Sequence, residues 1–163
     1  MFFVSTHSYI ELRARSAFSF LRGGSLPEHL AARAAELGHP AFGVSDRMGV
    51  YGAPRVFAAG RESGVRPIIG CELVMADGSV VPVLVETRTG YQNLCRLLTR
   101  AHLRAPKGEG VVQWDELPEF AAGLVALTGD HEGPVLRALL QSADAGAAVE
   151  RMETVFGRDQ VFV

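Results

Sequence analysis

The sequence predicts an α/β fold built from strand–loop–helix units, and three apolar segments that end in charged residues are the basis of this prediction. These segments are Tyr9 to Arg15, Ala41 to Arg47 and Val65 to Leu73. Each of the first two is followed by a glycine-containing loop and a segment with helical periodicity. In parallel α/β folds the carboxyl ends of the strands face one common site. We therefore expect the charged side chains at these ends to gather in one place, namely Arg13, Arg15, Asp46, Arg47 and Glu72.

A first helix is predicted to begin near Pro27. Ser25 and Glu28 have the spacing of a capping box, and a proline in the first turn lacks only an N–H that has no helical partner. Gly38 supplies a stop signal. The apolar face of this helix is expected to consist of Leu26, Leu30, Ala34 and Leu37.

The middle of the chain predicts a second helix and then a hairpin. The helix runs over Ala53–Ser63 and ends at Gly64, which is a typical helix terminator. The pair Asp77-Gly78 lies between two apolar runs and is a strong hairpin signal. Pro82 in the second arm indicates an edge strand or a bulge, because proline cannot donate to a sheet.

The remaining segments continue the α/β pattern. We predict a helix over Tyr91–His102, a polar loop over Ala105–Gly110, a short helical turn over Trp114–Phe120, a strand over Leu124–Thr128, helices over Pro134–Gln141 and Ala145–Phe156, and an apolar run over Gln160–Val163. Because β/α units normally complete a sheet or barrel, we expect residues 1–163 to be a fragment of a longer protein. The two late strands should then be exposed edges, which predicts self-association of the fragment.

Composition excludes several classes of protein. A hydrophobic content of 48%, a charged content of 21% and a net charge of −2 are typical of a soluble globular chain without a global preference for nucleic acid. Cys71 and Cys95 have no CxxC spacing, which argues against a zinc knuckle or a disulfide framework. The amino terminus lacks signal-peptide character, and no apolar run reaches the roughly 18 residues of a membrane span. We expect a cytoplasmic protein that does not contact a membrane.

Three longer segments carry a resemblance to a known family. They are ELRARSAFSFLRGG from Glu11, LGHPAFGVSDRMGVYGAPRVFAAGRESGVRPIIGCEL from Leu37, and TGYQNLCRLLTRAH from Thr89. Together they closely resemble the polymerase-and-histidinol-phosphatase (PHP) domain that opens the bacterial DNA polymerase III alpha subunit. The patterns R-S-x-F-S-F-L-x-G and D-R-x-G-V-Y-G-A-P-R look most like the error-prone branch, which is used in translesion synthesis. The resemblance covers nearly the whole chain from about Tyr9, so we expect residues 1–163 to be the N-terminal part of a PHP domain.

The resemblance implies a fold and a metal site. The fold is a distorted (β/α)7 barrel, of which this chain would form a partial, truncated version. In active family members, His, Asp, Glu and Cys side chains at strand ends hold metal ions that hydrolyse phosphoesters. This sequence has Arg13 and Arg15 where the family has His-x-His, and Asp46-Arg47 where it has Asp-His. The acidic ligand of the third motif is retained as Glu72.

Two later family positions also differ. A further histidine corresponds to Val80 or Val81, and a cysteine corresponds to Asp130. Arginine has no lone pair to donate to a metal. The resemblance therefore implies a degenerate metal-site cluster without metal or catalytic residues, made of Arg13, Arg15, Asp46, Arg47, Glu72 and Asp130.

A physical reason favours arginine at these positions. Without metals, Asp46 and Glu72 would be buried charges with nothing to neutralise them. Guanidinium groups can supply positive charge and bidentate hydrogen bonds in place of coordination. We therefore expect an ion-pair cluster in the old metal pocket.

Other residues near the first strand allow two interpretations. Ser16 and Ser19 could suggest a nucleophile, but hydrogen bonding within the loop is the simpler interpretation. Phe18, Phe20 and Leu21 could form a stacking platform for bases, although a role in the core is favoured. His131, beside Asp130, is the one histidine with a chance of facing the old site.

Three functions follow as hypotheses. The leading one is a non-catalytic PHP domain that braces an error-prone DNA polymerase and offers a surface to replication or mutasome proteins. The complete protein would synthesise DNA on a template, contacting DNA and using magnesium in a polymerase domain outside this segment, so that no cofactor is expected here. One alternative is a metal-dependent PHP phosphoesterase or 3′–5′ exonuclease. The other is a module in which the arginines bind phosphate or another anion.

Overall fold

The computed structural model describes residues 9–163, and residues 1–8, on which the prediction of no signal peptide rests, lie outside the described part. The strands are β1 Glu11–Ala14, β2 Ala41–Arg47, β3 Arg66–Val74, β4 Val80–Val85, β5 Leu124–Leu127 and β6 Val161–Phe162. The helices are α1 Pro27–Glu36, α2 Ala53–Ser63, α3 Arg88–Leu103, α4 Leu117–Phe120, α5 Pro134–Leu140 and α6 Ala145–Phe156. Among residues 9–163, none of the helices is long and apolar enough to cross a membrane.

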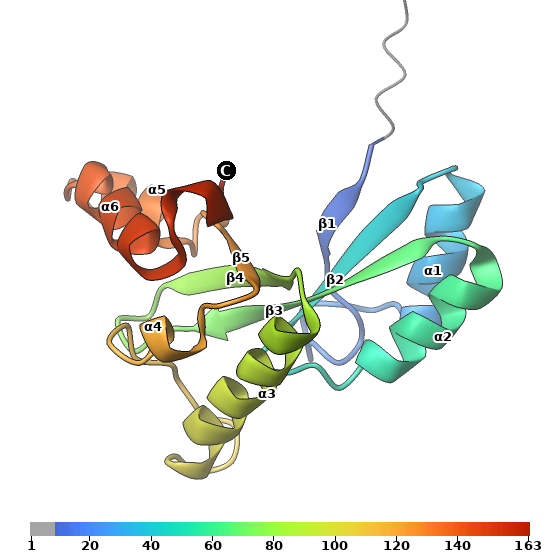
Figure 1. Ribbon diagram of the computed structural model, residues 1–163, viewed down its shortest axis with the longest axis horizontal. Helices are drawn as coiled ribbons and strands as arrows, with labels where there is room; N and C mark the ends of the chain where they lie inside the picture. The colour runs from blue at the N-terminus through green and yellow to red at the C-terminus, as the bar shows by residue number, and fades with distance from the viewer. Residues whose placement is uncertain (1–8) are drawn as a thin grey trace, which may run out of the picture.

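All six strands belong to one sheet in the order β1-β2-β3-β4-β5-β6. The first three strands pair in parallel, as the strand–loop–helix pattern predicts. β4 is antiparallel to both β3 and β5, and β6 is parallel to β5. The sheet is curled and not flat (Figure 1). The result is an α/β fold with the form of a partial, distorted β/α barrel.

The two faces of the curled sheet have different surroundings. On β2, Phe42 and Val44 pack against Ala31 of α1 and Val56 of α2. A second and larger cluster joins β3, β4 and β5 to helices α3, α4 and α6. We call this helix-covered side the outer face and the opposite, concave side the inner face. Side chains alternate along a strand. Phe42, Val44 and Asp46 of β2 therefore point to the outer face, and Ser45 and Arg47 point to the inner face.

Glycine signals in the middle of the chain are confirmed. Helix α2 has the predicted bounds and ends at Gly64, which has a φ of 71°. The β3–β4 hairpin turns at Asp77-Gly78, where Gly78 has a φ of 80°. A left-handed φ of this kind is adopted by glycine without the strain that a Cβ would add.

The predicted capping box of the first helix is wrong. The N-cap of α1 is Leu26, and no side chain caps the helix. Glu28 instead binds Arg55 of α2, with Arg55 Nη2 donating to Glu28 Oε2 over 2.9 Å. The carboxylate of Glu28 therefore forms an ion pair between α1 and α2 and does not cap the helix.

One of the two predicted sheet edges is confirmed, because β6 (Val161–Phe162) lies at the end of the strand order within residues 9–163. The other needs correction. Leu124–Leu127 is not an edge, because β5 pairs with β4 on one side and with β6 on the other. Pro82 is likewise inside the sheet, opposite Glu72 of β3. The ladder between β4 and β5 begins only at Val83, so Pro82 lies just beyond the segment that pairs with β5.

Candidate functional site

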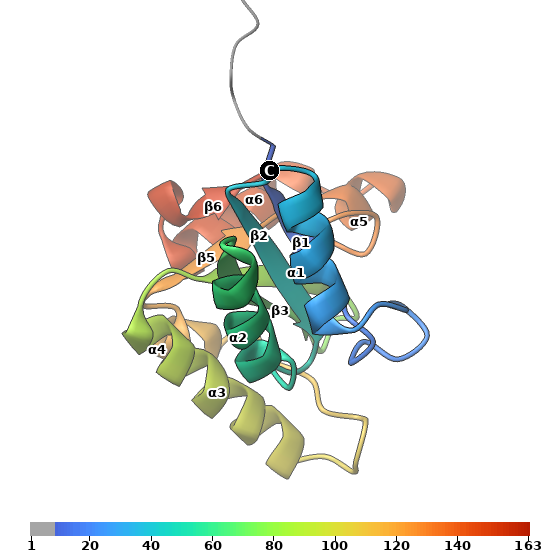
Figure 2. The same cartoon turned by 90° about the vertical axis from the view of Figure 1, so that its right-hand side faces the viewer.

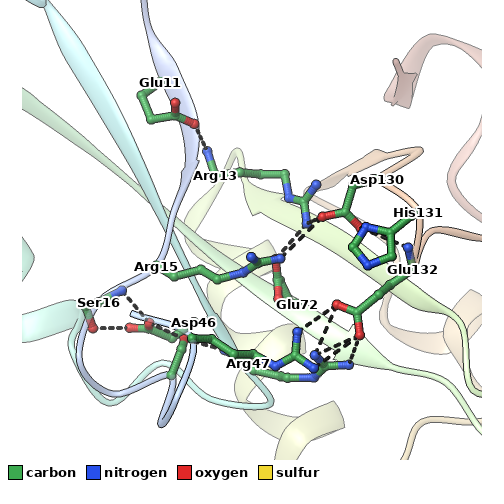
Figure 3. Close-up of polar contacts among 12 residues, drawn as sticks. Glu11, Arg13, Arg15, Ser16, Asp46, Arg47, Glu72, Asp130, His131 and Glu132 are labelled. Atoms are coloured by element: carbon green, nitrogen blue, oxygen red, sulfur yellow. Dashed lines mark hydrogen bonds and ion pairs between the residues drawn. The ribbon is translucent and has the colours of Figure 1, made fainter. Parts of the chain in front are cut away.

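The carboxyl ends of the parallel strands bring charged residues together on the inner face. Arg47 of β2 lies opposite Glu72 of β3 in the ladder, so both side chains point to the same side of the sheet. Arg13 on β1 and Arg15 just after it reach the same place, where the loop that follows β5 adds Asp130 (Figure 3). Four of the six residues predicted to share a site, Arg13, Arg15, Glu72 and Asp130, therefore form one network.

Glu72 is the centre of this network and is fully buried, with 0% of its surface exposed. Its Oε1 accepts a hydrogen bond from Arg13 Nη2 at 2.7 Å and another from Arg15 Nε at 2.8 Å. The hydrogen bond to Glu72 in turn raises the pKa of Arg15 above its ordinary value. Two guanidiniums on one oxygen supply the positive charge that a buried carboxylate requires. Within residues 9–163, Glu72 Oε2 has no hydrogen-bond partner.

Asp130 links the two arginines from the opposite side. Its Oδ2 lies 3.2 Å from Arg13 Nη2 and 3.5 Å from Arg15 Nη2. Burial alone would raise the pKa of Asp130, but the backbone N–H of Glu132 and the positive charge of Arg13 outweigh it, so the pKa is lowered. Asp130 therefore stays ionised and connects the loop after β5 to the first strand.

Arg47 has a different partner from the one expected. Its Nη2 lies 3.1 Å from Glu132 Oε1, and Arg22 Nη1 donates to Glu132 Oε2 over 2.8 Å. Burial tends to raise the pKa of Glu132, but its hydrogen bonds from Arg47 and Arg22 lower it overall. Neither Glu132 nor Arg22 was among the site residues predicted from the sequence. Glu132 could have been found from its place two residues after Asp130, whereas nothing in the sequence signals Arg22.

Asp46 does not join the arginines, and the expectation that guanidiniums neutralise it is wrong. Because Asp46 and Arg47 are consecutive in β2, their side chains point to opposite faces of the sheet. Asp46 is buried and accepts hydrogen bonds from Ser16 N at 2.8 Å, Ser16 Oγ at 2.7 Å and Ser19 Oγ at 2.6 Å. Figure 3 shows Asp46 turned toward Ser16 and away from Glu72.

The serines confirm the simpler of the two interpretations offered for them. Both hydroxyls bond to Asp46 and so fix the loop after β1 against β2. The core role favoured for the neighbouring apolar residues is wrong, because Phe18, Phe20 and Leu21 are 39%, 83% and 90% exposed. The loop is anchored through its polar side chains, so its apolar side chains are left facing outward.

The structure also shows where the other candidate residues lie. Val80 and Val81, one of which the resemblance places at a family histidine, are both buried in the described part. His131 lies beside Asp130, with 75% of its side chain exposed. Burial raises the pKa of Cys71 to about 12, so this thiol stays protonated and is a poor metal ligand.

These residues do not fit the metal cluster that the resemblance implies for active family members. The three carboxylates on the inner face, Glu72, Asp130 and Glu132, are each bound by at least one guanidinium. Arginine cannot coordinate a cation, and its charge repels one. Among the residues that the structure describes, no group of three or more His, Cys, Asp or Glu side chains is arranged to hold a metal ion.

Comparisons with known proteins place this geometry in context. The family described as "PHP domain" matches residues 11–163. An error-prone DNA polymerase from Anaeromyxobacter sp. (strain K) is 42% identical over 161 residues, which cover 92% of this chain and 13% of that protein. An error-prone DNA polymerase from Pseudomonas aeruginosa is 41% identical over 130 residues, covering 78% of this chain and 13% of that protein.

A polymerase subunit and a solved structure are also similar to this chain. A DNA polymerase III subunit alpha from Caulobacter vibrioides is 35% identical over 169 residues, covering 95% of this chain and 15% of that protein. The chain therefore spans only a small part of the length of these curated relatives. Among solved structures, an amidohydrolase from Chromobacterium violaceum is similar with a TM-score of 0.48 and 15% identity, covering 89% of this chain and 49% of that one.

Proposed function

Because this chain belongs to the PHP domain family, with relatives named error-prone DNA polymerase and DNA polymerase III subunit alpha, we propose that it is a non-catalytic PHP domain of an error-prone DNA polymerase. Its role is structural: it braces the rest of the polymerase chain and presents a surface to partner proteins. The relatives that it resembles are much longer polymerase chains, of which the matched segment makes up 13%, and this supports the assignment.

The observation that carries the proposal is the engagement of Glu72 by two arginines. The resemblance implies that this carboxylate is a metal ligand in active family members. Here Oε1 of Glu72 accepts from Arg13 and Arg15, at positions where the family has histidines. The replaced ligands have become an ion-pair cluster that ties β1, β3 and the loop after β5 together. Such a cluster serves the fold instead of a hydrolytic reaction.

The proposal places DNA synthesis elsewhere in the complete protein. Template-directed nucleotidyl transfer with magnesium would belong to a separate polymerase domain, and the PHP domain would meet DNA only through that domain. We place this activity in translesion synthesis in the cytoplasm, with replication or mutasome proteins as partners. The relatives called error-prone DNA polymerases are the support for this context.

A metal-dependent phosphoesterase or 3′–5′ exonuclease is the second candidate, because the inner face carries three carboxylates. Carboxylate oxygens are ligands that magnesium and manganese prefer. Glu72, Asp130 and Glu132 would have to release their arginines before they could bind a cation. An anion-binding role is the third candidate, since Arg13 and Arg15 converge on one oxygen of Asp130.

Metal content and hydrolysis together test these candidates. We expect the 163-residue chain, after dialysis against manganese or zinc, to retain far less than one metal per chain and to leave bis-p-nitrophenyl phosphate intact. About one retained metal per chain that is lost in Glu72→Gln would overturn the proposal in favour of the phosphoesterase. Line broadening of inorganic phosphate in ³¹P NMR that disappears in Arg15→Met would favour the anion site instead.

A further inference from the structure

The tight turn between β3 and β4 leaves part of the outer face without a helix. β2 connects to β3 through α2, which packs against the sheet. β3 connects to β4 through the hairpin at Asp77-Gly78, and a hairpin brings no helix with it. Between α2 and the start of α3 the outer side is hollowed into an open groove of about 680 Å³. Figure 2 looks onto this side, with α2 and α3 toward the viewer.

The groove is lined largely by apolar side chains. Pro54 and Phe57 of α2 form one wall, Tyr91 of α3 lies on the other side, and Ile69 of β3 is part of the floor. Phe57 is 55% exposed, and Ile69 is only partly buried although β3 lies in the middle of the sheet. An apolar hollow of this kind, bordered by polar groups, is typical of an interaction site.

The rim of the groove carries positive charge. Arg66 and Arg88 line it, and the guanidinium of Arg61 lies 6.0 Å from the centre of the Phe57 ring. None of these three arginines forms an ion pair within residues 9–163. Glu86 lies on the same rim and offsets one of the three charges. The arginines on the inner face, in contrast, are matched by carboxylates from the same chain.

We propose that this groove is a docking site for an amphipathic helix of a partner protein, with apolar residues on the buried side and Asp or Glu along its flanks. A helix that lays its apolar face into a hydrophobic groove is a common mode of peptide recognition. Phe57 and Ile69 would contact that face, while Arg66 and Arg88 would pair with the acidic flank and set its orientation. The site is separate from the inner-face cluster, so it stands whether or not the chain is catalytic.

A display library tests the chemistry of the occupant directly. The probe is a library of random 16-residue sequences in a helical scaffold, selected on the 163-residue chain. We expect enriched sequences with apolar residues spaced i, i+4 and i+7 and with acidic residues beside them. The strongest sequence, made as a fluorescein-labelled peptide, should bind with an anisotropy change that falls as salt is raised.

Matched variants locate the binding. Phe57→Glu should weaken binding of the labelled peptide at least tenfold. Arg66→Glu combined with Arg88→Glu should weaken this binding and remove most of its salt dependence. Phe20→Glu is the control, because Phe20 is also an exposed phenylalanine but does not line this groove. Circular dichroism should show all variants folded, since every changed residue is exposed.

Three results would overturn the proposal. One is the absence of enrichment, or enrichment of sequences that carry no acidic residues. Another is a peptide that binds Phe57→Glu as tightly as it binds the unchanged chain. The third is a dimer, detected by light scattering, that the Phe57→Glu variant does not form. A second copy of this chain would then be the occupant of the groove.

Discussion

Arg15 Nη2 lies 2.6 Å from Oε1 of Glu72, a carboxylate whose side chain has no exposed surface. Arg13 forms an ion pair with the same oxygen, so two arginines in or just after β1 neutralise one carboxylate of β3. This contact fixes β1 to the sheet through side chains, while the backbone ladder between β1 and β2 is interrupted by a register shift. The stability of the first strand should therefore depend strongly on charge.

Removing one of these arginines should destabilise the fold. In Arg15→Met, Glu72 stays buried with only Arg13 to neutralise it, and breaking a buried ion pair costs about 3 kcal/mol of unfolding free energy. Urea unfolding followed by circular dichroism measures this. Arg33→Met is the control, because Arg33 pairs with Glu36 at the surface and should change stability by less than about 0.5 kcal/mol. Equal effects of the two variants would mean that Glu72 is stabilised by something other than Arg15.

The hydroxyl of Ser19 should matter for the loop after β1. Ser19→Ala removes a hydrogen bond to the buried carboxylate of Asp46, and bonds to charged groups contribute about 1.5 to 3 kcal/mol. Thermal unfolding should show a lower midpoint, and limited proteolysis should cut residues 16–24 faster. Thr154→Ala serves as the comparison, since its hydroxyl bonds to a backbone carbonyl on an exposed helix. Unchanged proteolysis in Ser19→Ala would show that the serines do not anchor the loop.

The carboxylates of the loop after β5 should make the fold sensitive to acid. The pKa values of Asp130 and Glu132 are lower in the folded chain than their ordinary values of 3.8 and 4.5, so the unfolded chain binds more protons as pH falls. Their contribution to stability is therefore complete above about pH 5 and is lost as pH falls through their folded-state pKa values. Urea unfolding between pH 3 and 7 should show this decline. The double variant Asp130→Asn, Glu132→Gln should decline less steeply, and an identical slope would contradict the assignment.

Gly90 should not tolerate a methyl group. A Cβ at this position would lie 1.9 Å from the backbone oxygen of Gly123, where the first turn of α3 meets the start of β5. Gly90→Ala should cost about 3 kcal/mol, because the contacted atom is backbone and cannot move aside easily. Gly24→Ala is the matched control, since nothing lies within 4 Å of a Cβ there. A Gly90→Ala chain as stable as Gly24→Ala would mean that α3 packs differently.

Features with a local physical cause could be predicted from the sequence. Helix α2 and the β3–β4 hairpin have their predicted positions because Gly64 and Gly78 adopt left-handed backbone angles. The approach of Arg13 to Glu72 follows from the parallel strands, whose carboxyl ends meet on one side of the sheet.

Features that depend on the direction of a side chain or on the conformation of a loop could not be predicted from the sequence. Asp46 was grouped with the arginines although it precedes Arg47 by one residue, and strand alternation sends neighbouring side chains to opposite faces. The pairing of Glu132 with Arg22 depends on two loops whose paths have no sequence periodicity. The same holds for Phe20, since apolar character alone does not tell which way a loop residue points.

The ion pairs of the inner face join residues that leave the ribosome far apart in time. Arg22 and Glu132 are 110 positions apart, and Arg13 and Asp130 are 117 apart. At a synthesis rate of about 5 to 20 residues per second, the arginines of the first strand region wait roughly 5 to 20 seconds for these partners. During that interval the nascent chain exposes Phe20 and Leu21 on a loop that cannot yet form its ion pair from Arg22 to Glu132. We expect this to be the period in which a chaperone would engage the growing polypeptide.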